Sequence, residues 1–197
     1  RPAPSAPTRA ATEPAPGEVT VGGNSFVIHK HRATRLHYDV RLERDGGLPS
    51  WAVPKGPSPN PADKRLAVQT EDHPVDYVNF EGLIPPDNYG AGAVIVWDRG
   101  QWVALNDFAA GFGKGKLLFE LRGHKLRGKW TLVKTKRAKS EWLLIKERDA
   151  YVSEQGTEGY PADSVLSGRT VEQVAAGDPR GKESAARLRK RKAPQRD

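Results

Sequence analysis

Alternation of apolar and polar residues with a period of two is the feature that most restricts the fold of this chain. Segments such as SFVIHKH, KLLFELRG and EWLLIKE show it, and turn-forming runs such as DGG and RGHKLRG separate them. This period is typical of half-buried β-strands. WDRGQW predicts a tight hairpin joining two strands, and LRGHKLRGKW predicts another. Many short antiparallel strands in one domain predict an all-β barrel or sandwich.

Helical signals are scarce in the same region. The best candidate is TVEQVAAG, where Thr170 is the expected N-cap, Gln173 completes a capping box and Gly177 ends the helix. We therefore expect few, short helices beside the strands.

Both ends of the chain have the composition of linkers. Residues 1–21 are rich in Pro and Ala, which predicts a loosely laid arm. Residues 177–197 predict a basic tail, because eight basic and two acidic residues between Arg180 and Asp197 supply +6 of the formal net charge of +8. Such a tail is a weak aid to phosphate-backbone binding. The ordered domain is expected over residues 22–176.

Composition excludes several classes of site. The chain has no Cys, so a metal would have to be bound by nitrogen and oxygen ligands. No apolar run approaches the ~18 residues that span a bilayer, and no signal-peptide pattern begins the chain. We expect a cytosolic protein without a membrane partner. Met is lacking even at position 1, which indicates a processed chain or a piece of a longer protein.

The run HKHRATRLHYDVRLE concentrates three of the five histidines of the chain. If LHYDVRLE is a strand, its residues separate onto two faces. The apolar face carries Leu36, Tyr38, Val40 and Leu42. The polar row on the other face consists of His37, Asp39, Arg41 and Glu43. A twisted barrel can point such a row into its interior, where a ligand would lie.

The polar row has the chemistry of a metal and phosphate site. His37 and Asp39 offer a nitrogen and an anionic oxygen on one side of a rigid strand, and His31 joins them if RATR bends the chain. His29 has the same parity as His31, although three ligands already suffice. Such a trio leaves coordination positions open for Lewis-acid chemistry, and Arg41 beside it suits a bidentate grip on phosphate. An HxD pattern by itself is more often part of an ordinary surface strand than of a metal site.

A second cluster lies in TEDHPVDYVNFEG. The imidazole of His73 and the phenol of Tyr77 can donate hydrogen bonds to a phosphoryl oxygen, and His73 can serve as a general acid. Lys55 and Arg65 are further candidates for phosphate contact. The alternative is a loop with a buried tyrosine and two surface cations.

Taken together, these residues closely resemble the 3′-phosphoesterase domain of bacterial DNA ligase D. FVIHKHRATRLHYDVRLE, SWAVPKGPS, DKRLAVQTEDHPVDYVNFEG, IPPDNYGAGAVIVWDRG and EWLLIK carry the resemblance, in order, over about Phe26 to Glu147. It implies a compact β-barrel with a polar, metal-containing cavity. It implies removal of a 3′-terminal ribonucleoside and then of the 3′-phosphate from a primer strand, which leaves a 3′-OH for double-strand-break repair by end joining. Mn²⁺ is the metal it implies.

The resemblance also assigns roles. It implies that His31, His37 and Asp39 are the metal ligands. It implies that Arg41, His73 and Tyr77 contact phosphate and that Lys55 and Arg65 contribute to activity. Glu13, in ATEP, matches an accessory glutamate of the ribonuclease step. Ala6 and Pro7 stand where an Arg-Asp pair is expected, so the phosphatase step has the stronger support.

The implied setting is the bacterial cytoplasm, at the nucleoid. The implied partners are primer–template 3′ ends, polymerase and ligase domains of the same polypeptide, and Ku as a candidate. No ligase lysine motif is present, so we do not expect ligation by this chain.

Two rival functions fit parts of the pattern. HYD with a distant His73 or His124 also suits the two-histidine, one-carboxylate triad of non-haem iron oxygenases, although no clamp for a cosubstrate carboxylate is evident. The other rival is a non-catalytic module that binds DNA ends, against which stands the presence of every matched site residue.

Overall fold

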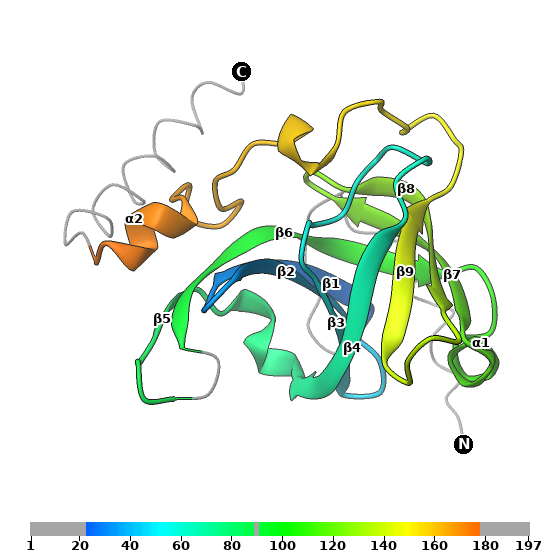
Figure 1. The fold of residues 1–197 in the computed structure, drawn as a ribbon, viewed down its shortest axis with the longest axis horizontal. Helices are drawn as coiled ribbons and strands as arrows, with labels where there is room; N and C mark the ends of the chain where they lie inside the picture. The colour runs from blue at the N-terminus through cyan, green and yellow to red at the C-terminus, as the bar shows by residue number, and fades with distance from the viewer. Residues whose placement is uncertain (1–22, 89–90, 178–197) are drawn as a thin grey trace.

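The computed structural model describes residues 23–88 and 91–177 (Figure 1). The prediction of an all-β barrel with few short helices is confirmed. The strands are β1 (Ser25–Arg32), β2 (Leu36–Leu42), β3 (Gly47–Val53), β4 (Arg65–Pro74), β5 (Gly82–Ile84), β6 (Gly92–Ala104), β7 (Lys116–Gly123), β8 (Arg127–Lys134) and β9 (Glu141–Lys146). The helices are η2 (Val75–Asn79), α1 (Phe108–Lys114), η3 (Thr157–Gly159) and α2 (Val171–Ala175). No helix in the described ranges is long and apolar enough to cross a membrane.

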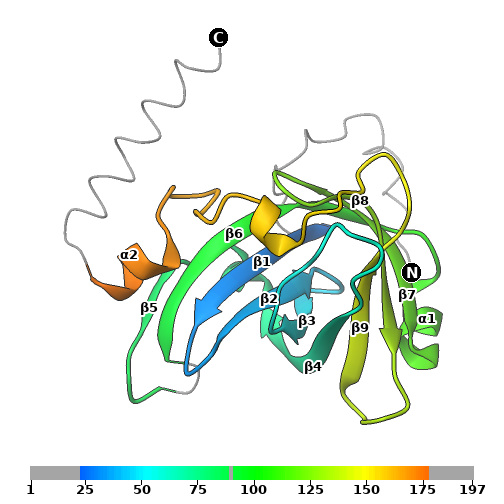
Figure 2. The same ribbon diagram turned by 45° about the horizontal axis from the view of Figure 1, so that its top comes forward.

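Eight of the strands close into a barrel. They follow the order β1-β2-β3-β4-β9-β8-β7-β6, and β6 pairs back onto β1, with every neighbouring pair antiparallel. β5 extends the sheet beyond β6 and lies beside the barrel (Figure 2). Closure satisfies the backbone groups that open sheet edges would leave unpaired.

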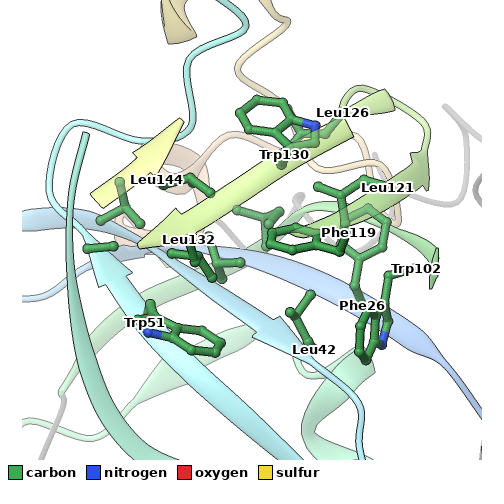
Figure 3. Close-up of a cluster of buried hydrophobic side chains, with 14 of the residues drawn as sticks. Phe26, Leu42, Trp51, Trp102, Phe119, Leu121, Leu126, Trp130, Leu132 and Leu144 are labelled. Carbon is green, nitrogen blue, oxygen red and sulfur yellow. The ribbon is translucent and has the colours of Figure 1, made fainter. Parts of the chain in front are cut away.

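The barrel interior is apolar. Figure 3 shows Phe26, Trp51, Phe119 and Trp130 converging inside it. All eight barrel strands and α1 contribute to this one cluster, which includes Ile28, Tyr38, Val40, Leu42, Val53, Ala67, Trp97, Trp102, Phe108, Leu117, Leu121, Leu126, Leu132, Trp142 and Leu144.

The polar row therefore lies on the outside of the barrel. Tyr38, Val40 and Leu42 belong to the interior cluster, so the intervening Asp39 and Arg41 point to the outer face. The expectation that the row lines the barrel interior is wrong, because an eight-stranded barrel is about filled by its own side chains. Leu36 of the expected apolar face is exposed, since it lies where β2 begins.

WDRGQW does not form the predicted hairpin, because β6 continues through it. Gly100 is required there by a close approach rather than by a turn: a Cβ on it would lie 2.2 Å from the carbonyl oxygen of Arg122 in β7. Asp98 is also no turn residue. Its buried carboxylate accepts the backbone N–H groups of His124, Lys125 and Leu126 and so fixes the β7–β8 turn. That turn is the predicted LRGHKLRGKW hairpin, which is confirmed.

The predicted capping box begins α2. The Thr170 side chain accepts from the Gln173 backbone N–H, the Gln173 side chain accepts from the Thr170 N–H, and Gly177 follows with φ +62°. The sequence prediction missed α1, whose start is capped by Asp107. Two glycines inside FAAGFGK obscured its helical pattern, in which Phe108 and Phe112 stack on the barrel end.

Gly100→Ala should destabilise the fold, because the new methyl group would collide with the backbone of β7. We expect a loss of about 1–3 kcal/mol in the free energy of unfolding, measured by denaturant titration of tryptophan fluorescence. Gly113→Ala in α1 is the control, since nothing lies within 4 Å of a Cβ there. It should be neutral or stabilising by up to about 1 kcal/mol. Equal effects of the two substitutions would contradict the close-approach explanation.

Candidate metal and phosphate site

A groove with a volume of about 800 Å³ lies on the outer face of β1–β4. Its floor includes Asp39, Arg41 and Ala52. The β1–β2 turn (residues 33–35) and residues of the segment between β5 and β6 line it, and Tyr77 of η2 contributes from the side. The outward faces of four strands thus meet in one concave surface.

The three predicted metal ligands come together in this groove. The turn after β1 reverses the chain so that His31 pairs directly with His37 across the β1–β2 ladder. The Nε2 atom of His37 is 3.2 Å from Asp39 Oδ2, and the Nδ1 atom of His31 is 3.8 Å from the same oxygen. Each residue offers a ligand atom, and these atoms lie within 4.8 Å of one another. The predicted bend at RATR is therefore confirmed.

The protonation of this trio suits a divalent cation. Burial disfavours the charged form of Asp39, but the hydrogen bond from His37 and the charge of Arg41 outweigh it and lower the pKa of Asp39. The hydrogen bond to Asp39 outweighs burial and raises the pKa of His37. Two imidazoles and one carboxylate form a donor set that fits first-row divalent metals. A cation would take the position of a proton on His37, so its affinity should rise with pH.

Arg41 is held beside the trio by four hydrogen-bonding or ionic contacts. Its Nη2 lies 3.3 Å from Asp39 Oδ2, and its Nη1 donates to Ser50 Oγ at 2.9 Å. Nη1 is also 3.1 Å from the Nδ1 atom of His73, and Nε donates to His29 Nδ1 at 3.0 Å. The guanidinium is thus fixed in place before any substrate arrives, which reduces the cost of ordering it on binding.

His29 positions Arg41, a role that the sequence did not reveal. Since a guanidinium can only donate, His29 Nδ1 must accept, and its Nε2–H then donates to the carbonyl oxygen of Phe80 at 3.1 Å. Burial, followed by the charge of Arg41, lowers the pKa of His29 to about 3. His29 is therefore a neutral acceptor. Strand alternation correctly placed His29 on the same face as His31. Only its contact with Arg41 shows that its role is to position the guanidinium.

A β-bulge turns His73 into the groove. Ser50 pairs with Thr70 and Leu48 pairs with His73, so β4 has one more residue than β3 over this stretch. Without the extra residue, alternation would place His73 on the opposite face from Thr70. Burial and the charge of Arg41 lower the pKa of His73.

Tyr77 packs over the cationic end of the site. The Arg41 guanidinium lies 5.3 Å from its ring centroid, and the His73 ring centroid lies 5.1 Å from it. The Phe80 ring stacks on the Tyr77 ring, with their centroids 5.0 Å apart. Burial raises the pKa of Tyr77, so the phenol keeps its proton and stays a hydrogen-bond donor at neutral pH.

Three predicted residues lie away from this cluster. Lys55 is exposed in the turn after β3, and Arg65 shares the inward parity of Ala67 and contacts Asp63 at 3.7 Å. Neither is among the described residues that line the groove. Glu43, at the end of the polar row, accepts instead from Ser25. Glu13 and most of the predicted tails lie outside the described residues.

A family model for the DNA ligase D 3′-phosphoesterase domain matches residues 29–134, which include all the clustered site residues. The chain belongs to this family.

Curated relatives of this phosphoesterase family are much longer than the chain. One is the multifunctional non-homologous end joining protein LigD of Pseudomonas aeruginosa, 50% identical over 163 residues, which are 79% of this chain and 19% of the relative. The proteins of the same name from Mycobacterium bovis and Mycolicibacterium smegmatis are 45% and 43% identical over 69% and 70% of this chain, and over 18% and 19% of their own lengths. The chain thus spans about a fifth of these relatives.

His37→Ala and Asp39→Ala should each weaken Mn²⁺ binding by about tenfold or more, because each removes one of the three expected protein ligands. Calorimetric titration with MnCl₂ measures the affinity directly. His124→Ala is the matched control, since His124 is an exposed histidine outside the groove. Unchanged affinity in both site variants would contradict the assignment of the ligands.

His29 should make the fold sensitive to acid. Its folded pKa of about 3 lies below the ordinary 6.5, so the unfolded chain takes up a proton that the folded chain refuses. The stability contributed by neutral His29 is present above pH 6.5 and is lost toward pH 3, at about 1.4 kcal/mol per pH unit. Denaturant unfolding of His29→Gln between pH 7 and pH 4 should show a slope shallower by about this amount. Parallel slopes would contradict a buried neutral imidazole.

Proposed function

We propose that this chain is a metal-dependent DNA 3′-end phosphoesterase that removes a 3′-phosphate from a primer strand and leaves a 3′-OH. The observation that carries the proposal is the juxtaposition of the His31–His37–Asp39 trio with a pre-positioned Arg41 in one groove. Membership of the 3′-phosphoesterase family supports it.

The trio would hold the cation, for which Mn²⁺ is our choice. When bound, the cation supplies Lewis-acid stabilisation of the negative charge that develops on the phosphoryl oxygens. Arg41 would bind the phosphate, since its guanidinium is fixed and lies at the same carboxylate as the ligands. Tyr77, protonated at neutral pH, would donate a further hydrogen bond to a phosphoryl oxygen.

His73 has two neutral forms, and each matches one of its contacts. With Nδ1 accepting from Arg41 Nη1, the proton is on Nε2, and the Nε2–H can donate a hydrogen bond to a leaving oxygen. With Nδ1–H donating to the carbonyl oxygen of Glu71, at 3.1 Å, Nε2 is a bare acceptor. We assign the first form to the step that releases the 3′-oxygen.

We extend the proposal to removal of a 3′-terminal ribonucleoside, with Glu13 as an accessory residue and Lys55 and Arg65 as contributors. The relatives are named multifunctional non-homologous end joining proteins, which supports end joining as the pathway and further domains on the same polypeptide. We propose polymerase and ligase activities for those domains, and Ku as a candidate partner. We propose the bacterial cytoplasm, at the nucleoid, as the location, because the proposed substrate is a DNA end.

The oxygenase alternative loses its proposed distal ligand. His73 contacts Arg41 rather than the trio, and His124 lies in the β7–β8 turn outside the groove. His31 completes the two-histidine, one-carboxylate set instead. Arg41 at the carboxylate favours a phosphate substrate over an oxygenase cosubstrate. The intact network around Arg41 likewise argues against a decayed, non-catalytic DNA-binding module.

Incubation with Mn²⁺ and a primer–template that carries a 3′-phosphate should convert it to 3′-OH. Arg41→Ala should reduce kcat/KM by about 100-fold or more, because it removes a fixed charge from the developing oxyanions, and His37→Ala should remove most of the Mn²⁺-dependent rate. Gel analysis of the primer measures both. Circular dichroism confirms folding, and His124→Ala serves as the control. A normal rate in Arg41→Ala would overturn the assignment.

A further inference from the structure

The turn between β8 and β9 carries a dense group of cations. Lys134, Lys136, Arg137 and Lys139 fall within the seven-residue run KTKRAKS, and all four are exposed. Arg137 contacts Glu141 at 3.5 Å while its side chain remains 84% exposed. The stem of Lys134 packs near Gly115 at the barrel end, so Lys136, Arg137 and Lys139 form the outward part of the turn. We call these three residues the basic turn.

Strand register aligns the basic turn with the metal ligands. Asp39 pairs with Ala52, Ala52 pairs with Val68, and Val68 pairs with Glu141, the residue that contacts Arg137. Three strand spacings of ~4.8 Å separate Glu141 from Asp39 by about 14 Å, measured along the curved outer surface of the barrel. The turn is anchored there by the Gln69 N–H, which donates to the Ser140 carbonyl oxygen at 2.8 Å. Figure 2 shows β4 and β9 side by side, with this turn at their lower end.

Only short side chains project from the surface between Asp39 and Glu141 along this line of paired residues. Ala52 and Val68 are its only residues on the two intervening strands, and both have short apolar side chains. An extended strand could therefore cross from the metal ligands to the basic turn without displacing a large side chain. Each phosphate of one DNA strand advances ~3.4 Å along the axis of a duplex and about twice that where the strand is extended, so about 14 Å corresponds to roughly two to four phosphates.

We infer that the basic turn binds the phosphodiester backbone of the DNA strand whose 3′ end occupies the groove, roughly two to four nucleotides from that end. This inference rests on the proposed function for the location of the 3′ end. Lysine and arginine side chains would neutralise backbone phosphates and release their counterions. The contact would add affinity without reading sequence.

The test compares two double variants that each remove two exposed cations. Lys136→Ala/Lys139→Ala alters the basic turn and spares the Arg137–Glu141 pair. Lys129→Ala/Arg148→Ala is the control, with its exposed side chains toward the opposite ends of β8 and β9. Fluorescence anisotropy would measure binding of the chain to a 3′-phosphorylated primer–template at several salt concentrations. Turnover would be measured with Mn²⁺ on that substrate and on a 3′-phosphorylated dinucleotide.

The turn variant should bind the primer–template on the order of tenfold more weakly at low salt, with a slope of log Kd against log salt smaller by about 1 to 2. Its kcat/KM should fall similarly on the primer–template and stay unchanged on the dinucleotide, which is too short to reach the turn. An unchanged salt slope, an equal loss in the control variant, or an equal loss on the dinucleotide would overturn the inference. If the wild-type chain converts neither substrate, the proposed function fails, while the binding measurements still decide the role of the turn.

Discussion

Closure of the sheet between β1 and β6 is the constraint on which the site depends. Once eight strands surround one apolar interior, each strand must give one face to that interior, and strand geometry commits the other face to the outside. β1 and β2 use the outside face for histidine, aspartate and arginine. The rigidity that holds Asp39 and Arg41 in register therefore comes from Tyr38 and Val40, which pack behind them in the barrel.

The buried Arg41 shows how the fold makes a cation available to a substrate. A guanidinium removed from water needs hydrogen-bond acceptors, and Asp39, Ser50 and His29 supply them. Of these only Asp39 carries a charge, because burial keeps His29 neutral. A second carboxylate in place of His29 would have given the group a net negative charge and weakened its attraction for phosphate. The neutral imidazole fixes the geometry of Arg41 without adding a negative charge beside it.

Sequence reasoning located the site well wherever alternation alone decides which way a side chain points. His37, Asp39 and Arg41 are spaced by two on one strand, and His31 follows from a simple reversal of the chain. Whether this face points into the barrel or away from it could not be predicted. Alternation separates the two faces of a strand, but it does not say whether the barrel interior is filled by side chains or holds a ligand. The orientation of His73 depends on a β-bulge, and the position of a bulge cannot be read from the alternation of residues. Gly100 and Asp98 resemble turn residues, yet a close backbone approach and a buried anchor explain them. Tyr77 lies in a helical turn, where strand periodicity gave no guidance. It was a candidate because of its phenol beside His73, and the family resemblance implied its role.

Asp39 couples the two halves of the site. Its Oδ2 atom is the common neighbour of His31, His37 and Arg41, so one carboxylate would serve the proposed metal ligands and the proposed phosphate-binding arginine together. Asp39 and Arg41 cancel in formal charge, and the groove becomes strongly attractive to an anion only when a further cation shares the carboxylate. Affinity for a phosphate ester and affinity for a divalent cation should consequently reinforce each other, and by linkage the reinforcement is equal in both directions. The short spacing of His37, Asp39 and Arg41 on β2 is the structural basis of that reciprocity.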